Sequence, residues 1–116
     1  MSNKPKILIV DDNDMLRQML VDMLSADYCV SSVASGREMF NLLKAENDYD
    51  LVLADISMPG GDGDEVAAQV RKLGCNTPIL FMSGVSGLGI EVNLPKPFSR
   101  DELLTAIRQA LAPRGR

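Results

Sequence analysis

The chain has 116 residues and a formal charge of −4 at pH 7, from 12 basic and 16 acidic side chains, and 46% of its residues are hydrophobic. These values fit one globular domain and argue against a basic nucleic-acid surface. The sequence contains no histidine, which excludes histidine general-base catalysis, imidazole metal sites and phosphohistidine chemistry on this chain.

Neither a secretory leader nor a membrane span is predicted. The start, MSNKPKILIV, runs straight into polar residues, and no run approaches the roughly 18 apolar residues of a membrane helix. We therefore expect a cytoplasmic protein that has no membrane partner. Cys29 and Cys75 form neither a zinc nor a redox pattern, and we expect both thiols to be buried.

The first half of the chain alternates strand and helix patterns. KILIV at 6–10 is a continuous apolar run, typical of a strand buried on both faces, whereas YCVSSV at 28–33 alternates in part and suits an edge strand. Between them, residues 14–25 carry a broad apolar stripe on one helical face, which we expect to pack in the core. Ser35 and Glu38 form a capping-box signature that predicts a second helix. The apolar stripe comprises Met15, Leu16, Met19, Leu20, Met23 and Leu24.

The second half continues this alternation. Buried-type strands are predicted at 50–54 (DLVLA) and 78–82 (PILFM), and a shorter fifth strand is predicted at 92–94 (VNL). Helical patterns cover 64–73 and 99–111, and the latter opens with a second capping box. This order of elements predicts a doubly wound α/β domain with a five-stranded parallel sheet. We expect a single domain over residues 1–116, in which the last five residues, APRGR, are a tail or the start of a linker.

Charged and polar side chains follow the predicted strands, at the edge where such sheets bind ligands. Asp11 and Asp12 follow the first strand and Asp55 the third, while Ser83 closes the fourth and Lys96 follows the fifth. Because the carboxyl ends of parallel strands meet at one edge, we expect the three carboxylates to lie within several ångströms of one another. A hard divalent cation would resolve their mutual repulsion, and such carboxylates with waters suit Mg²⁺.

This set holds the groups that phosphoryl transfer to a carboxylate needs. Asp55 would be the nucleophile that forms an aspartyl phosphate, and a metal would neutralise charge on the entering phosphoryl oxygens. The Lys96 ammonium and the Ser83 hydroxyl would bind other phosphoryl oxygens. Taken singly, each residue has an ordinary reading as a turn residue, a helix cap or a solvated surface side chain.

Three stretches, ILIVDDND, DLVLADISMPGGDG and LPKPF, resemble the signature blocks of the receiver domain of two-component response regulators, to which chemotaxis regulators belong. The resemblance covers nearly the whole chain and implies the strand order 2-1-3-4-5. It also implies that Asp55 receives its phosphoryl group from the phosphohistidine of a histidine kinase or histidine phosphotransfer protein. The absence of histidine fits, since that donor must then lie on another domain.

The resemblance implies roles for single residues of this chain. Asp12, Asp55 and the backbone carbonyl of Ser57 match the Mg²⁺ ligands of the family, and Asp11 matches a residue that acts through water. Such a domain accepts a phosphoryl group without turning over external substrates. We expect its output to be contact with another protein or relay of the phosphoryl group.

The segment between the fourth and fifth strands departs from the family. Ser83 matches the switch hydroxyl and Lys96 the family's lysine, with a cis bond expected between Lys96 and Pro97, yet only 96 − 83 = 13 positions separate the two. The eight residues 84–91 must return along a strand of about 17 Å, but as a helix they would advance only about 12 Å. We therefore expect the family's fourth helix to be missing or reduced to a loop.

A second departure concerns the switch. Asn93 stands three positions before Lys96, where receivers usually carry Tyr or Phe. The usual coupling between the switch hydroxyl and an aromatic ring is therefore not expected to operate. A homodimer is not expected to use the family's common face, since that face includes the fourth helix.

Alternative functions remain at this point. A pseudo-receiver would keep the fold and dock partners without being phosphorylated. A phosphatase of the haloacid-dehalogenase type needs a second aspartate two residues after the nucleophile, where this chain has Ser57. A flavodoxin-like FMN binder is not expected, because its first loop must receive a phosphate and the acidic run DDND at 11–14 would repel one. A phosphate-binding loop is not expected either, because the glycines between 84 and 89 lack the lysine and the helix that such a loop needs.

Overall fold

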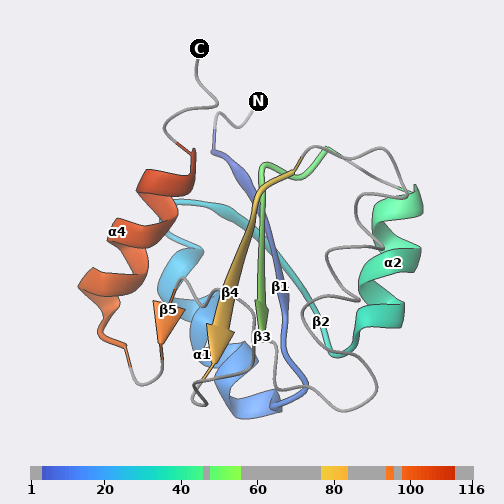
Figure 1. The fold of residues 1–116 in the computed structure, drawn as a ribbon, viewed down its shortest axis with the longest axis horizontal. Helices are drawn as coiled ribbons and strands as arrows, with labels where there is room; N and C mark the ends of the chain where they lie inside the picture. Colours follow the sequence, from blue (N-terminus) through green and yellow to red (C-terminus); the bar gives the residue numbers. More distant parts are fainter. Residues whose placement is uncertain (1–3, 46–47, 56–76, 84–93, 96–97, 112–116) are drawn as a thin grey trace.

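Five parallel strands form the centre of the molecule (Figure 1). The computed structural model describes residues 4–45, 48–55, 77–83, 94–95 and 98–111. Its strands are β1 (Lys6–Val10), β2 (Cys29–Val33), β3 (Leu51–Asp55), β4 (Ile79–Ser83) and β5 (Leu94–Pro95). They lie in the order β2-β1-β3-β4-β5, and every neighbouring pair is parallel. The predicted sheet and its strand order are thus confirmed.

The described helices cover both faces of this sheet. α1 (Asp14–Leu24) and the final helix, α4 (Arg100–Leu111), pack on one face, and α2 (Gly36–Ala45) packs on the other (Figure 1). The doubly wound α/β class is therefore confirmed. The helix predicted at 64–73 and the short crossover at 84–91 lie outside the described residues, so the missing fourth helix of the family stays a prediction. No helix in the described part of the chain is long and apolar enough to cross a bilayer.

β1 lies between two apolar cores. Ile7 and Ile9 belong to the core beneath α1 and α4, whereas Leu8 and Val10 belong to the core beneath α2. All four side chains are completely buried. Successive side chains of a strand point to opposite faces, so a central strand covered on both sides must be apolar at every position. This explains the continuous apolar run ILIV at 7–10, which follows the half-buried Lys6 at the start of the strand.

Both predicted capping boxes start helices. At the start of α4, Ser99 Oγ accepts a hydrogen bond from Glu102 N–H (3.1 Å) and Glu102 Oε1 accepts one from Ser99 N–H (2.8 Å). At the start of α2, Ser35 Oγ accepts from Glu38 N–H (3.1 Å), but Glu38 Oε1 accepts from Ala34 N–H (2.8 Å) instead of Ser35 N–H. In each box, main-chain donors that lack helical partners are satisfied.

The apolar stripe of α1 is only partly a core element. Leu20 and Leu24 are fully buried, whereas the side chains of Met15 and Met19 are 85% and 47% exposed. The prediction that the whole stripe packs in the core was therefore wrong for these two methionines. Each one precedes a leucine by one residue, which turns it about 100° around the helix axis and away from the sheet.

Cys29 is exposed, so the prediction that both thiols are buried was wrong for this residue. It is the first residue of β2, which lies at the edge of the sheet and pairs only with β1 among the described strands. A side chain at the end of an edge strand has fewer neighbours to cover it than one in a central strand. Cys75 lies outside the described residues.

Candidate functional site

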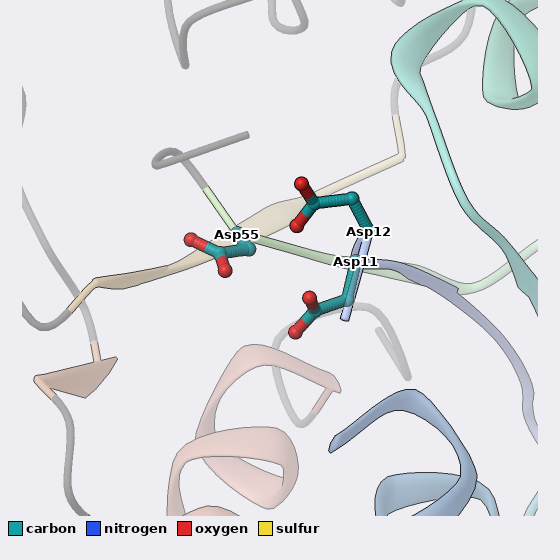
Figure 2. Close-up of side chains that lie close together, drawn as sticks. All are labelled: Asp11, Asp12 and Asp55. Carbon is teal, nitrogen blue, oxygen red and sulfur yellow. The ribbon is translucent and has the colours of Figure 1, made fainter. Parts of the chain in front are cut away.

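Three carboxylates gather at the carboxyl edge of the sheet (Figure 2). Asp11 and Asp12 follow β1, and Asp55 is the last residue of β3. Each side chain offers an oxygen, and these oxygens all lie within 4.8 Å of one another. Asp11 and Asp55 are buried while Asp12 is exposed, so the cluster is open to solvent on one side. The predicted convergence of the three aspartates is confirmed.

Strand register brings these residues together. β1 and β3 are adjacent and parallel, with Val10 opposite Ala54, so Asp11 and Asp55 leave the pair at the same level. On the other side of β1, Asp11 N–H donates to the main-chain oxygen of Val33 at the end of β2 (3.2 Å). The main chain at Asp11 is thus placed by the strands on both sides of β1, so the carboxylate cluster is fixed to the sheet.

The loop from β1 to α1 is organised by hydrogen bonds around Asp11. Asn13 N–H donates to Asp11 Oδ1 (2.9 Å), and Asn13 Oδ1 accepts from Leu16 N–H (3.0 Å) as the N-cap of α1. Arg17 reaches back over the first turn and donates to the main-chain oxygen of Asp11 (2.8 Å). These contacts fix how the two adjacent aspartates leave the strand.

The donor set fits Mg²⁺. Two oxygens bound to one Mg²⁺ at about 2.1 Å can lie at most about 4.2 Å apart, and the three carboxylate oxygens are within 4.8 Å of one another. Small side-chain movements, or one carboxylate acting through water, therefore suffice to surround the ion. All three ligand atoms are hard oxygens, and one exposed side leaves room for the waters that Mg²⁺ retains.

Other predicted site residues are placed only in part. Ser83 is the last residue of β4, and its backbone pairs with Pro95 of β5, directly before Lys96. Asp55 pairs with Met82, the residue before Ser83, so Ser83 ends its strand at the same edge of the sheet. Ser57, Lys96 and Asn93 lie outside the described residues, as does the bond between Lys96 and Pro97.

Sequence reasoning missed two residues that support the cluster, Asn13 and Arg17. An asparagine just before an apolar helical pattern is a recognised N-cap signal and could have identified Asn13. No sequence pattern predicts that the Arg17 side chain turns back to the Asp11 carbonyl. That contact depends on the angle between strand and helix.

A shallow groove runs along the exposed side of α1, the helix that follows Asp11 and Asp12 in the sequence. It is lined by Met15, Gln18, Met19, Asp22 and Met23. Within it, Gln18 Nε2 donates to Asp22 Oδ1 (3.0 Å), which orders the polar rim. The groove therefore offers a mainly apolar surface along most of α1.

A family model of the response regulator receiver domain matches residues 7–108 of the chain. Among curated proteins, Response regulator MprA of Mycolicibacterium vanbaalenii is 38% identical over 116 aligned residues, covering 91% of this chain and 50% of the relative. Transcriptional regulatory protein TcrA of Mycobacterium tuberculosis is 35% identical, covering 95% of this chain and 47% of the relative. The chain thus spans about half the length of the curated relatives it matches.

Solved structures show the same likeness over the whole domain. A response regulator receiver protein from Sinorhizobium medicae has a TM-score of 0.84 at 32% identity, covering 97% of this chain and 98% of the other. The non-phosphorylated HemR receiver domain from Leptospira biflexa has a TM-score of 0.81 at 31% identity, covering 94% and 95%. The chemotaxis protein CheY4 of Vibrio cholerae has a TM-score of 0.80 at 29% identity, covering 93% and 99%.

Proposed function

The chain belongs to the response regulator receiver domain family, and on this premise we propose that Asp55 accepts a phosphoryl group from a partner phosphohistidine. The observation that carries the proposal is the approach of Asp11, Asp12 and Asp55 to within 4.8 Å at the carboxyl edge of the sheet. Because these 116 residues contain no histidine, the phosphohistidine would lie on another domain, that of a histidine kinase or histidine phosphotransfer protein.

The reaction is a group transfer without redox change. A carboxylate oxygen of Asp55 attacks the phosphorus, a new O–P bond forms, and the N–P bond of the donor breaks. The bonding electron pair returns to the imidazole nitrogen, which takes up a proton from water. Asp55 is buried at the end of a rigid strand, so its carboxylate is held in place for the incoming group.

Asp12, Asp55 and the backbone carbonyl of Ser57 would hold Mg²⁺, and Asp11 would act on it through a water molecule. When bound, Mg²⁺ supplies positive charge that offsets the negative charge of the phosphoryl oxygens. The fit of the carboxylate oxygens to this ion supports the assignment for the three aspartates. The Lys96 ammonium and the Ser83 hydroxyl would bind the remaining phosphoryl oxygens.

The phosphodonor would dock on α1. This helix begins two residues after Asp12, and it exposes Met15 and Met19 on its first turns. Exposed methionines form adaptable apolar contact surfaces. A donor seated there could bring its phosphohistidine to Asp55 without displacing any part of the sheet.

The output would be contact with another protein or relay of the phosphoryl group, without turnover of external substrates. The relatives that share this domain are about twice as long, and one of them is named a transcriptional regulatory protein. Any homodimer would use a face other than the family's common one, if the crossover at 84–91 lacks the fourth helix.

The test is phosphorylation by acetyl phosphate, followed by intact mass spectrometry. We expect one phosphoryl group per chain in Mg²⁺, none in EDTA and none on Asp55→Asn. Asp27→Asn is the matched control, because Asp27 is an exposed aspartate after α1 and should label like the wild type. Equal labelling of Asp55→Asn would place the phosphoryl group on another residue and refute the proposal for Asp55. No labelling of the wild type, together with no Mg²⁺-dependent binding of beryllofluoride, would favour a docking module that is not phosphorylated.

A further inference from the structure

We propose that Arg17 is a positioning residue for the phosphoacceptor site, which holds the peptide between Asp11 and Asp12 so that their carboxylates converge on Asp55. The inference rests on the proposed function, because it concerns the same carboxylates. Arg17 itself touches neither the carboxylate of Asp12 nor that of Asp55 in any contact that the structure describes, so it would act through the main chain.

The guanidinium of Arg17 makes two hydrogen bonds across the first turn of α1. Its Nη1 donates to the main-chain oxygen of Asp11 (2.8 Å), and its Nη2 donates to Asp14 Oδ1 (2.5 Å). The side chain is only 21% exposed. A planar guanidinium with both nitrogens engaged cannot rotate without breaking a contact, so it is a more rigid strut than a flexible ammonium.

The carbonyl that Arg17 binds belongs to the peptide that joins the two aspartates. On its strand side, Asp11 is held by the hydrogen bond from its N–H to Val33 O. On its helix side, the Arg17 contact sets the direction of the carbonyl, and thus the plane of the Asp11–Asp12 peptide. Rotation of that plane would swing Asp12, which is exposed and has little packing to hold it.

Arg17 also reaches the loop through its own main chain, since Arg17 N–H donates to Asn13 O (2.9 Å). Asn13 N–H in turn donates to Asp11 Oδ1 (2.9 Å). Substitution of the Arg17 side chain leaves both of these bonds in place. A side-chain variant therefore removes the hold on the Asp11 carbonyl while the start of α1 keeps its main-chain hydrogen bonds.

Charge and position predict opposite effects for loss of the Arg17 side chain. A cation close to the acidic cluster repels Mg²⁺, so a purely electrostatic role predicts tighter Mg²⁺ binding when the cation is removed. A positioning role predicts weaker binding, because the ligands are no longer held in place. The direction of the change in Mg²⁺ affinity therefore separates the two.

The experiment compares Arg17→Met, Arg17→Lys and the control Arg108→Met with the wild type. Arg108 is exposed on the last turn of α4, a different helix from the one that carries Arg17, so its variant removes the same charge elsewhere. Arg17→Lys keeps the charge and the aliphatic stem but loses the planar pair of donors. It carries the test alone if Arg17→Met does not fold.

Mg²⁺ affinity is measured by isothermal titration calorimetry, and thermal unfolding in EDTA reports the stability of the metal-free protein. We expect Mg²⁺ to bind Arg17→Met roughly tenfold more weakly than wild type, the size found for residues that orient metal ligands. We expect an intermediate value for Arg17→Lys and an unchanged one for Arg108→Met. In acetyl phosphate labelling, the Arg17 variants should need more Mg²⁺ but approach the wild-type rate when it is saturating.

Unchanged or tighter Mg²⁺ binding by Arg17→Met would overturn the inference, as would full wild-type affinity in Arg17→Lys. In both cases the proposed function survives, provided that the wild type binds Mg²⁺ and is labelled at Asp55. If the wild type neither binds Mg²⁺ nor is labelled, the proposed function fails and the inference falls with it.

Discussion

The main-chain N–H of Asn13 donates a hydrogen bond to Oδ1 of Asp11 across 2.9 Å, which ties the start of α1 to a carboxylate of the candidate site. Asn13 also caps the helix through its own side chain, which accepts from Leu16 N–H. One residue thus connects helix formation to the shape of the site. The stability of α1 and the placement of Asp11 are therefore coupled.

Asn13→Ala tests this helix cap. The variant loses the acceptor for Leu16 N–H but keeps its own N–H for Asp11, so we expect a loss of about 1 kcal/mol in the free energy of unfolding. Urea denaturation in EDTA measures it. Asn13→Ser restores a side-chain oxygen and should recover most of the loss, and an equal loss in both variants would contradict the capping role.

Asp12→Asn tests the acidic cluster as a Mg²⁺ site. Mg²⁺ that binds only the native state stabilises the wild type by about 2.7 kcal/mol at a concentration one hundred times its dissociation constant. We expect Asp12→Asn to lose most of this gain, yet to be no less stable than wild type in EDTA, because one of three repelling charges has gone. Thermal unfolding with and without Mg²⁺ measures both effects.

The control for this prediction is Asp27→Asn, which removes an exposed carboxylate after the last turn of α1. It should keep the full Mg²⁺-dependent stabilisation. If Asp12→Asn were stabilised by Mg²⁺ as much as Asp27→Asn, the ion would not bind at the cluster.

Lys6→Met tests the ion pair between Lys6, the first residue of β1, and Asp48, which lies just before β3. The hydrogen bond from Lys6 Nζ to Asp48 Oδ1 (2.7 Å) lowers the pKa of Asp48 below its ordinary value, and the charge of Lys6 acts in the same direction. Lys6 Nζ also lies 4.6 Å from the ring centroid of Tyr49. We expect the pKa of Asp48 to rise towards its ordinary value in Lys6→Met, as measured by NMR titration of its carboxyl carbon.

The sign of the pH dependence follows from that pKa. A carboxyl whose pKa is lower in the folded state stabilises the fold above its unfolded pKa, about 3.9, and loses this contribution as the pH falls through the folded value. The difference in stability between wild type and Lys6→Met should therefore shrink as the pH falls below about 4. Identical Asp48 titrations in the two proteins would refute the pairing.

The double variant Met15→Ser, Met19→Ser tests the donor surface. Both side chains are exposed, so we expect stability within about 0.5 kcal/mol of wild type and unchanged labelling by acetyl phosphate. We expect transfer from a phosphorylated histidine phosphotransfer protein that labels the wild type to slow roughly tenfold, because the donor loses its apolar contacts with the two methionines. A tenfold loss corresponds to about 1.4 kcal/mol of association free energy. Equal transfer to both proteins would place the donor elsewhere.

Most of the fold follows from local patterns. The continuous apolar runs mark β1, β3 and β4, because strands covered on both faces are apolar along most of their length. Ser99 marks the start of α4, because its hydroxyl accepts a hydrogen bond from a main-chain donor there. The strand ends were predicted to within one residue for β3 and β4. The fifth strand was predicted at 92–94 and is found at Leu94–Pro95.

The carboxylate cluster was also predictable, because adjacency of parallel strands brings the residues that follow them to one edge. Asp11 and Asp55 needed only the strand order and the ends of β1 and β3 to be placed together. The charges of such residues are visible in the sequence, and their repulsion makes a cation the expected partner.

Tertiary structure alone decided which face of α1 is buried and what holds Asp11. The methionines and leucines of α1 form adjacent stripes of similar hydrophobicity, and only the docking angle of the helix turns the leucines inward and leaves Met15 exposed. The contact from Arg17 to the Asp11 carbonyl likewise spans a strand and a helix. Local patterns record which residues are apolar or charged, but the direction of a long side chain is set by the packing of whole elements against one another.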